Sequence, residues 1–129
     1  MPYAERTRVP ARQTRGEIEE LIMRRKAKSF AIYTETAGAM VSFELQDRRI
    51  AFRLPLPEPK REQDIRSRWR GLLLCLKAKF EAIDRGVETF EQAFLAHTLM
   101  PDGRTVAEHV REPVALAYQG KAVPLLPAP

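Results

Sequence analysis

Few side chains in this sequence could bind a metal or take part in acid–base chemistry. The two histidines, His97 and His109, are separated by eleven residues, and there is a single cysteine. A zinc site needs further ligands, and the spacing His-Glu-x-x-His is missing from the sequence. Carboxylates such as Glu44, Asp47 and Asp102 lack the spacing of a metal-dependent nuclease. We therefore expect no metal and, without a phosphate-binding glycine loop, no cofactor.

Arg104 and His109 have the spacing Arg-x4-His. This pair resembles the ribonuclease motif of the all-helical HEPN family, in which the arginine and the histidine stabilise and protonate a scissile phosphate. Here a Pro-Asp-Gly turn precedes Arg104, and a predicted sheet precedes that turn, unlike an all-helical fold. We therefore predict a protein that is not an enzyme. A ribonuclease acting through Arg104 and His109 is kept as a third hypothesis.

Cys75 lies in the longest uninterrupted apolar run, residues 72–76, which is too short to span a bilayer. As the single cysteine it has no intramolecular disulfide partner, and its place in a predicted helix indicates a buried thiol. The N-terminal residues have no apolar leader segment. These features predict a cytoplasmic protein that does not enter a membrane.

Positive charge is concentrated in two segments of the chain. Residues 1–28 and residues 60–85 each carry eight Lys/Arg against four Asp/Glu, whereas the other segments are slightly acidic and the whole chain is +5. Both basic segments are predicted to be helical or to lead into a helix. This asymmetry favours a polyanionic partner.

We predict that the cations of these segments contact the phosphates of DNA or RNA. The predicted nucleic-acid-binding residues are Arg24, Arg25, Lys26, Lys28, Arg61, Arg66, Arg70 and Lys77. They also fit ordinary solvated flanks whose long stems cover apolar surface, and the first four suit the C-terminal end of a helix dipole. Single strands would also need exposed aromatic side chains for base stacking. Tyr3 and Tyr33 are the candidates, although Tyr33 is better interpreted as a core or edge residue of a sheet.

The elements that would position these cations begin with an extended arm, residues 1–13. Thr14 and Glu17 have the spacing of a capping box, which predicts a helix from Thr14 to about Ala27. Residues 29–35 are β-branched and aromatic, and residues 39–45 and 49–54 alternate apolar with polar side chains. The pattern predicts three antiparallel strands, with an outer face of undetermined role carrying Met40, Ser42, Glu44, Arg49 and Arg53.

The long helix predicted over residues 62–85 has two apolar sides. The wide one, with Trp69, Leu73 and Leu76, should cover the sheet. The second one, with Gly71, Ala78 and Ala82, is expected to receive the C-terminal helical segment, or alternatively the same helix of a second subunit.

The C-terminal part is predicted to contain two short helices. Capping boxes at Thr89/Gln92 and Thr105/Glu108 mark their starts, Pro113 should break or restart the second, and Gly120 should end it. The chain thus divides into the arm (1–13), a core (14–85), a helical extension (86–120) and a Pro-rich tail (121–129), all in one domain. The fold class is α+β, a three-stranded antiparallel sheet packed by two helices, α-β-β-β-α, with a helical extension.

This element order resembles the double-stranded-RNA-binding domain over about residues 14–85. In that family the second helix begins with a lysine-rich segment. The corresponding segment here, KREQDIRSRWR, is basic but differently spaced, so no binding residue is transferred. The segments RWRGLLLCLKAKFEAIDRG and TFEQAFLAHTLMPDGRTVAEHV, with the LLPAP ending, resemble an uncharacterised family of small phage and prophage proteins. That resemblance implies an origin near replication and recombination genes, in a bacterial host cell.

We therefore predict a non-catalytic accessory protein that binds nucleic acid through basic helix surfaces, in DNA replication or recombination. The alternative is a protein-interaction module or inhibitor, for example an anti-defence protein that acts on a host or phage nucleoprotein. Its surface, or that of a homodimer, would be the second apolar side of the 62–85 helix or the PLLPAP tail. Strandedness and the choice between DNA and RNA are left open.

Overall fold

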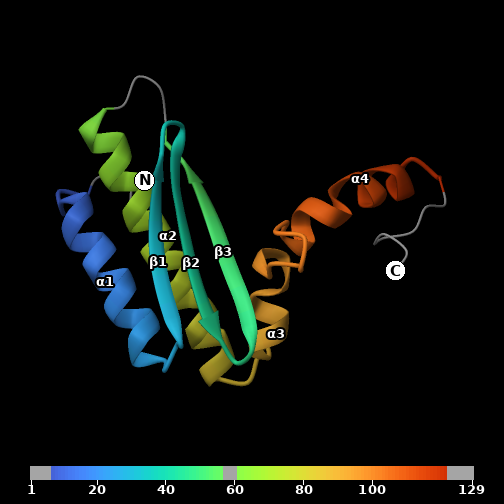
Figure 1. The fold of residues 1–129 in the computed structure, drawn as a ribbon, viewed down its shortest axis with the longest axis horizontal. Helices are drawn as coiled ribbons and strands as arrows, with labels where there is room; N and C mark the ends of the chain where they lie inside the picture. The colour runs from blue at the N-terminus through green and yellow to red at the C-terminus, as the bar shows by residue number, and fades with distance from the viewer. Residues whose placement is uncertain (1–6, 57–60, 122–129) are drawn as a thin grey trace.

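The computed structural model describes residues 7–56 and 61–121. It confirms the predicted α+β fold, with three antiparallel strands, a helix on either side of them in sequence, and a helical extension (Figure 1). The elements are α1 (Ala11–Arg24), β1 (Ser29–Glu35), β2 (Gly38–Leu45), β3 (Arg48–Pro55), α2 (Glu62–Asp84), α3 (Phe90–Ala93), the 3-10 helix η2 (Leu95–His97) and α4 (Val106–Tyr118).

The sheet has the strand order β1-β2-β3, and each neighbouring pair is antiparallel. A tight turn joins β2 to β3, with Gln46 and Asp47 in the left-handed region at φ 49° and 62°. Alternate residues of β2 are buried, which turns Val41 and Phe43 toward the helices. Gly38 opens β2 where a Cβ would lie 2.3 Å from the carbonyl oxygen of Leu54, so only glycine fits this approach.

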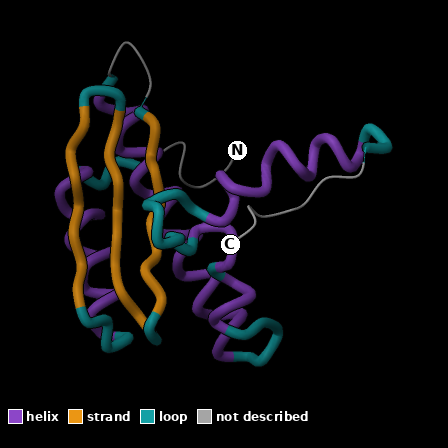
Figure 2. Tube along the Cα trace, turned by 45° about the vertical axis from the view of Figure 1, so that its right-hand side comes forward, coloured by secondary structure: helices purple, strands orange, loops and turns teal. Residues whose placement is uncertain are grey.

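Helices α1 and α2 cover the same face of the sheet and run parallel to one another (Figures 1 and 2). Near their starts, the side-chain amide of Gln63 donates to the carbonyl oxygen of Thr7 at 3.0 Å. At their ends, Arg25 bonds to Asp84. The core between helices and sheet is built mainly from large apolar residues: Ile18, Ile22, Val41, Phe43, Ile50, Phe52, Trp69, Leu73, Leu76 and Phe80. The parallel packing places both helix starts at one end of the molecule.

The predicted capping box at Thr14 is wrong. Helix α1 begins three residues earlier, at Ala11, directly after Pro10. Thr14 is fully buried inside the helix, and its hydroxyl group lies 3.5 Å from the carbonyl oxygen of Pro10. The helix also ends at Arg24 rather than near Ala27. The extended arm is therefore shorter than expected, and residues 1–6 of it lie outside the described residues.

The first part of the extension packs against the core. The predicted capping box at Thr89 and Gln92 is present, and it starts α3. Phe94 then inserts fully into the core. Farther along, the backbone N–H of Leu99 donates to the carbonyl oxygen of Arg49 at 2.7 Å. The extension is therefore joined to the outer edge of β3 by main-chain as well as apolar contacts.

Helix α4 departs from two predictions, although its capping box at Thr105 and Glu108 is present. It continues through Pro113 without a break. It also stands away from the sheet and α2 (Figures 1 and 2), and none of its residues is buried. As predicted, Gly120 closes it, in the left-handed region at φ 82°. The predicted tail lies outside the described residues from position 122 onward.

The second apolar side of α2 is consequently open. Apart from its chain neighbours and the backbone of its own helix, no atom lies within 4 Å of the position that a Cβ would take at Gly71, and 37% of Leu74 is exposed. The expectation that the C-terminal helix covers this side within one chain is therefore wrong, as is the predicted burial of Cys75, which is exposed. Within the described residues, no helix has the length and apolarity to cross a membrane.

His97 packs the extension against β3. Its titration should also make the free energy of unfolding depend on pH. Its ring stacks on Phe52, with centroids 3.9 Å apart, and burial together with the nearby Lys79 lowers its pKa from the ordinary 6.5. As the pH decreases through 6.5, His97 takes up a proton in the unfolded chain before it does so in the folded chain. The free energy of unfolding therefore falls as the pH decreases through 6.5.

We expect His97→Phe, which keeps a stacked ring but takes up no proton, to flatten the dependence of Tm on pH between about pH 7 and pH 5. Thermal denaturation followed by circular dichroism at several pH values would measure this. Parallel curves for the wild type and the variant over that range would contradict the assignment.

Candidate nucleic-acid interface

Five of the eight cations predicted to contact nucleic acid form ion pairs within the chain. The pairs are Arg24 with Glu20, Arg25 with Asp84, Lys28 with Glu44 and Asp47, Arg66 with Glu62, and Arg70 with Glu17. A neighbouring carboxylate compensates each of these charges locally. They therefore contribute less to the field that a polyanion meets than the sequence alone indicates.

Arg25 ties together the C-terminal ends of α1 and α2. Its two terminal nitrogens each donate to one carboxylate oxygen of Asp84 at 2.7 Å, a bidentate arrangement. Its guanidinium carbon also lies 4.5 Å from the ring centroid of Phe80. The hydrogen bonds raise the pKa of Arg25 and lower the pKa of Asp84. This geometry gives Arg25 a structural role.

Arg66 and Arg70 lie one turn apart on α2, and both side chains are largely buried. Arg70 donates from Nη1 to Glu17 Oε1 of α1 at 2.9 Å, and only 13% of its side chain is exposed. Arg66 pairs with Glu62 at 2.8 Å and donates to the side-chain oxygen of Gln63. Arg70 thus links α2 to α1, whereas Arg66 bonds to side chains of its own helix.

The other three predicted cations, Lys26, Arg61 and Lys77, are exposed and have no acidic partner among the described residues. Lys26 follows α1 in the left-handed region at φ 69°, and Arg61 is the N-cap residue of α2. Lys77 lies in the second half of α2. These three stay available to an external anion, but they are not gathered in one place.

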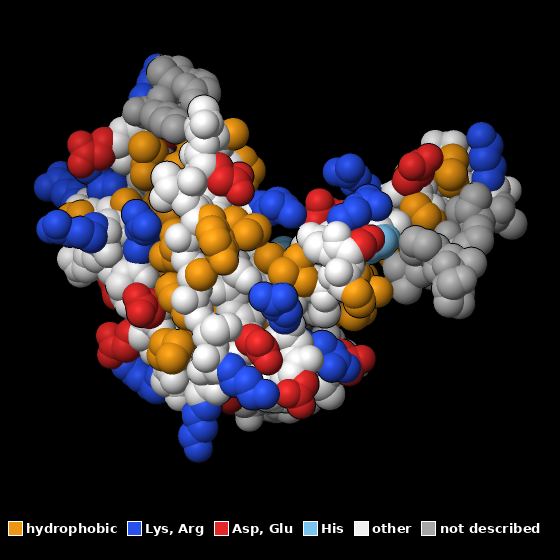
Figure 3. Space-filling view, in the orientation of Figure 1, with side chains coloured by type: hydrophobic (Ala, Val, Ile, Leu, Met, Phe, Trp, Pro, Cys, Tyr) orange, Lys and Arg blue, Asp and Glu red, His pale blue; other side chains and the backbone are white. Residues whose placement is uncertain are grey.

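The parallel helices instead gather other arginines with Arg61 at the end where both helices start. We call this group the helix-start cluster: Arg8, Arg12, Arg15, Arg61 and Arg68. Arg8, Arg12 and Arg61 are exposed and have no acidic partner in the described ranges. Figure 3 shows Lys and Arg side chains gathered over the start of α1, on the left of the view.

The other two members of the helix-start cluster are held without an acidic group. The guanidinium of Arg15 lies 5.4 Å from the ring centroid of Trp69, and Arg68 donates to the carbonyl oxygen of Pro55 at 3.2 Å. Of these five residues, only Arg61 is among the eight predicted nucleic-acid-binding residues. The other four could have been found from the odd number of strands between the helices. An odd number makes α1 and α2 run the same way, which brings the cations at their starts together.

The start of α1 is electropositive for a second reason. Its first turn contains no acidic residue, and its N-cap residue, Pro10, makes no side-chain cap. The free N–H groups of that turn carry the positive end of the helix dipole, where cations are disfavoured and anions favoured. The α2 start differs, because Glu62 and Asp64 lie in its first turn. At these positions Arg12 and Arg15 therefore do not stabilise α1 through its dipole.

The Arg-x4-His pair engages two different partners at the start of α4. Arg104 donates from Nη2 to the carbonyl oxygen of Glu108 at 2.9 Å. The Nε2 atom of His109 lies 2.8 Å from Asp102 Oδ2, with 6% of the His109 side chain exposed. A backbone hydrogen bond from Arg104 and the contact with His109 lower the pKa of Asp102. In the described part of the chain, no three His, Cys, Asp or Glu side chains group so as to hold a metal ion.

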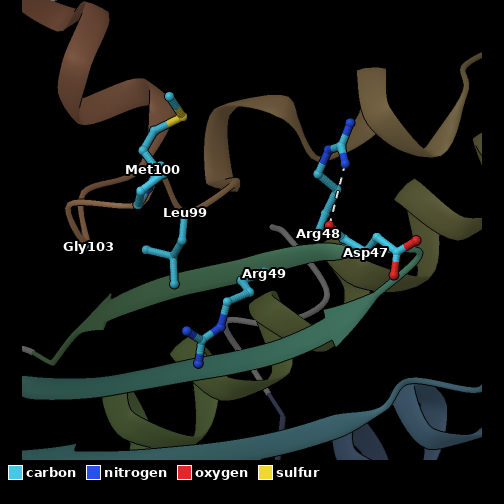
Figure 4. Close-up of a pocket in the computed structure, with 7 residues that line it drawn as sticks. Asp47, Arg48, Arg49, Leu99, Met100 and Gly103 are labelled. Atoms are coloured by element: carbon cyan, nitrogen blue, oxygen red, sulfur yellow. Dashed lines mark hydrogen bonds between the residues drawn. The ribbon is translucent and has the colours of Figure 1, made fainter. Parts of the chain in front are cut away.

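One pocket of about 270 Å³ opens between β3 and the segment that follows η2 (Figure 4). It is lined by Asp47, Arg48, Arg49, Leu99, Met100, Pro101 and Gly103. Arg49 is exposed and has no acidic partner among the described residues. The pocket brings a free guanidinium group beside apolar side chains of the extension.

The fold and its surface define a small α+β domain whose two parallel helices carry unpaired arginines at their shared start. Comparison of the chain with protein-family models, with curated proteins and with solved structures found no match.

Proposed function

We propose that this chain is a non-catalytic accessory protein that binds nucleic acid through the basic surface of its helix layer. The observation that carries this proposal is the helix-start cluster, in which Arg8, Arg12 and Arg61 are exposed and lack acidic partners among the described residues. Such a group meets a chain of phosphates well, because every neutralised phosphate releases a counterion.

The contacts of this surface are to phosphates and imply no reading of base sequence. Lys26 and Lys77, which are also unpaired within the described residues, would extend the contact along the helix layer. Paired residues such as Arg25 and Arg70 would act indirectly, by fixing α1 against α2. The proposed interface is thus narrower than the eight predicted residues and is shifted toward the helix starts.

We further propose that the protein acts in phage or prophage DNA replication or recombination, in the cytoplasm of the bacterial host. This part rests on the resemblance of residues 68–86 and 89–110 to small phage proteins whose genes lie near replication and recombination genes. It adds a setting to the binding proposal and does not change its physical basis.

The test is fluorescence anisotropy with labelled single- and double-stranded DNA and RNA over a salt series. We expect a Kd in the micromolar range or tighter at low salt, which rises with salt as several counterions are released. The preferred ligand would then identify the strandedness. Failure of every ligand to bind at low salt would contradict the proposal.

A second candidate function is protein interaction, and the open side of α2 favours it. Leu74, Cys75 and Ala78 are exposed there, and Gly71 leaves room for close approach by another helix. If this side forms a homodimer, sedimentation equilibrium should give a dimer mass that Leu74→Glu reduces to the monomer mass. A monomer at all concentrations would exclude the homodimer and leave a heterologous protein as the partner for this side.

A further inference from the structure

Neither helix covers the face of the sheet that is turned away from α1 and α2 (Figure 1). Strand register places Tyr33, Met40 and Arg53 side by side across this face, on β1, β2 and β3. Tyr33 is 52% exposed, so it is not a core residue. The next row across the same face is made of the small residues Ala31, Ser42 and Ala51, of which Ala51 is buried. The exposed ring of Tyr33 therefore has only small side chains in the neighbouring row.

Arginines border this row on the side of α4. Arg53 extends from β3 toward the start of α4, where its Nη2 lies 3.7 Å from Glu108 Oε1. Arg104 donates to the carbonyl oxygen of Glu108, and Arg111 lies about one turn farther along α4, exposed and without an acidic partner in the described residues. In Figure 3 the surface is hollowed between the sheet and α4, and both Lys/Arg and Asp/Glu side chains lie on its rim.

The carboxylate of Glu108, which lies beside Arg53, is already engaged in a helix cap, and the carboxylate of Asp102 accepts a hydrogen bond from the backbone N–H of Arg104. Glu108 Oε1 accepts hydrogen bonds from the backbone N–H and the hydroxyl group of Thr105 at 2.9 and 3.0 Å. These bonds, with smaller contributions from Arg53 and Arg104, lower the pKa of Glu108. The Glu108 carboxylate therefore stays charged while it caps the helix, and it offsets only part of the positive charge of Arg53, Arg104 and Arg111.

We propose that this face binds single-stranded nucleic acid, with a base stacked on Tyr33 and phosphates held by Arg53, Arg104 and Arg111. We call these four residues and Met40 the sheet trough. The proposal rests on the proposed function and adds a second surface to it. A flat exposed ring with arginines beside it suits a strand whose bases are free to stack, whereas a duplex keeps its bases inside the helix.

Charge complementarity decides in favour of a nucleic acid as the occupant. The apolar part of the trough is narrow, since Tyr33 and Met40 are followed on the same row by Arg53. Arg49 lies on the same face of β3, four residues from Arg53, and unlike Arg53 it has no acidic partner among the described residues. A polyanion satisfies these guanidinium groups.

The test compares Tyr33→Ala with the matched variant Tyr33→Phe, which keeps the ring. Anisotropy would be measured with a labelled oligo(dT) and with a labelled DNA duplex. We expect Tyr33→Ala to weaken oligo(dT) binding at least about fivefold and to leave duplex binding unchanged, because stacking on an aromatic ring contributes only to the single strand. Tyr33→Phe should keep the wild-type affinity for both ligands. Arg104→Glu combined with Arg111→Glu should weaken oligo(dT) binding more than duplex binding.

The outcomes separate this proposal from the proposed function. Normal oligo(dT) binding by Tyr33→Ala, with binding lost on reversal of the helix-start cluster, would overturn the trough and keep the proposed function. If the wild-type protein binds the duplex but not oligo(dT), the trough is likewise overturned and the proposed function is kept. Loss of oligo(dT) binding in Tyr33→Ala while reversal of the helix-start cluster has no effect would keep the trough and refute the helix surface. Absence of all binding would overturn both.

Discussion

Replacing Phe94 by alanine should lower the free energy of unfolding by about 3–5 kcal/mol, since a large ring is lost from a filled core. Phe94 is fully buried, and its ring lies within 5.1–6.2 Å, between centroids, of the rings of Phe43, Phe52, Phe80 and Phe90. These four rings come from β2, β3, α2 and α3, so one cavity would loosen the sheet, the long helix and the extension together. Urea denaturation would measure the change, and Tm should fall by roughly 10–20 °C.

The neighbouring residue supplies the control for this variant. Leu95 is 49% exposed, so Leu95→Ala should change stability by less than about 1 kcal/mol. A loss of similar size in both variants would mean that the chain is sensitive to any change in this segment. A loss below 1 kcal/mol in Phe94→Ala would contradict the view that the extension is part of the core.

Simultaneous substitution of Arg8, Arg12 and Arg61 by glutamate should weaken nucleic-acid binding at least about tenfold at 0.1 M salt. Each substitution removes one phosphate contact and adds a repulsive charge at the positive end of the helix layer. All three side chains are exposed and unpaired within the described residues, so the fold should be retained. Anisotropy would give the affinity, and circular dichroism would verify the fold.

A charge-matched variant controls for the change in net charge. Arg24, Arg85 and Lys121 are exposed cations outside the helix-start cluster, and two of them are paired with glutamates of their own helices. Their combined substitution by glutamate changes the net charge equally. It should weaken binding much less than the cluster variant. Equal losses would show that only total charge matters and that the cluster is not a site.

The alternation of side chains was sufficient to predict the sheet. Val41 and Phe43 alternate with Ser42 and Glu44, and the observed burial follows the same period. Capping boxes at Thr89 and Thr105 were also found correctly, because their hydrogen bonds join residues three apart. Thr14 fits the same local pattern, but its hydroxyl is buried at the helix–core contact, and Pro10 starts the helix instead. A local capping pattern thus predicts the helix start wrongly where tertiary packing buries the capping side chain.

Long-range contacts explain why only part of the candidate site was predicted. Arg25 and Asp84 are 59 positions apart, and Arg70 and Glu17 are 53 apart, so no spacing in the sequence reveals that these charges are compensated. The open side of α2 was missed for a related reason. The apolar pattern of residues 106–118 indicates a helix but does not fix its direction, and the segment before it pairs with the edge of β3 instead.

The most direct test of the helix-start cluster is the salt dependence of duplex binding for the wild type and for the Arg8, Arg12 and Arg61 glutamate variant. For B-DNA the slope of log K against log salt changes by about 0.9 for each phosphate contact. We expect the slope of the variant to be shallower by about 3, corresponding to three lost contacts. An unchanged slope would contradict phosphate binding at the shared start of α1 and α2.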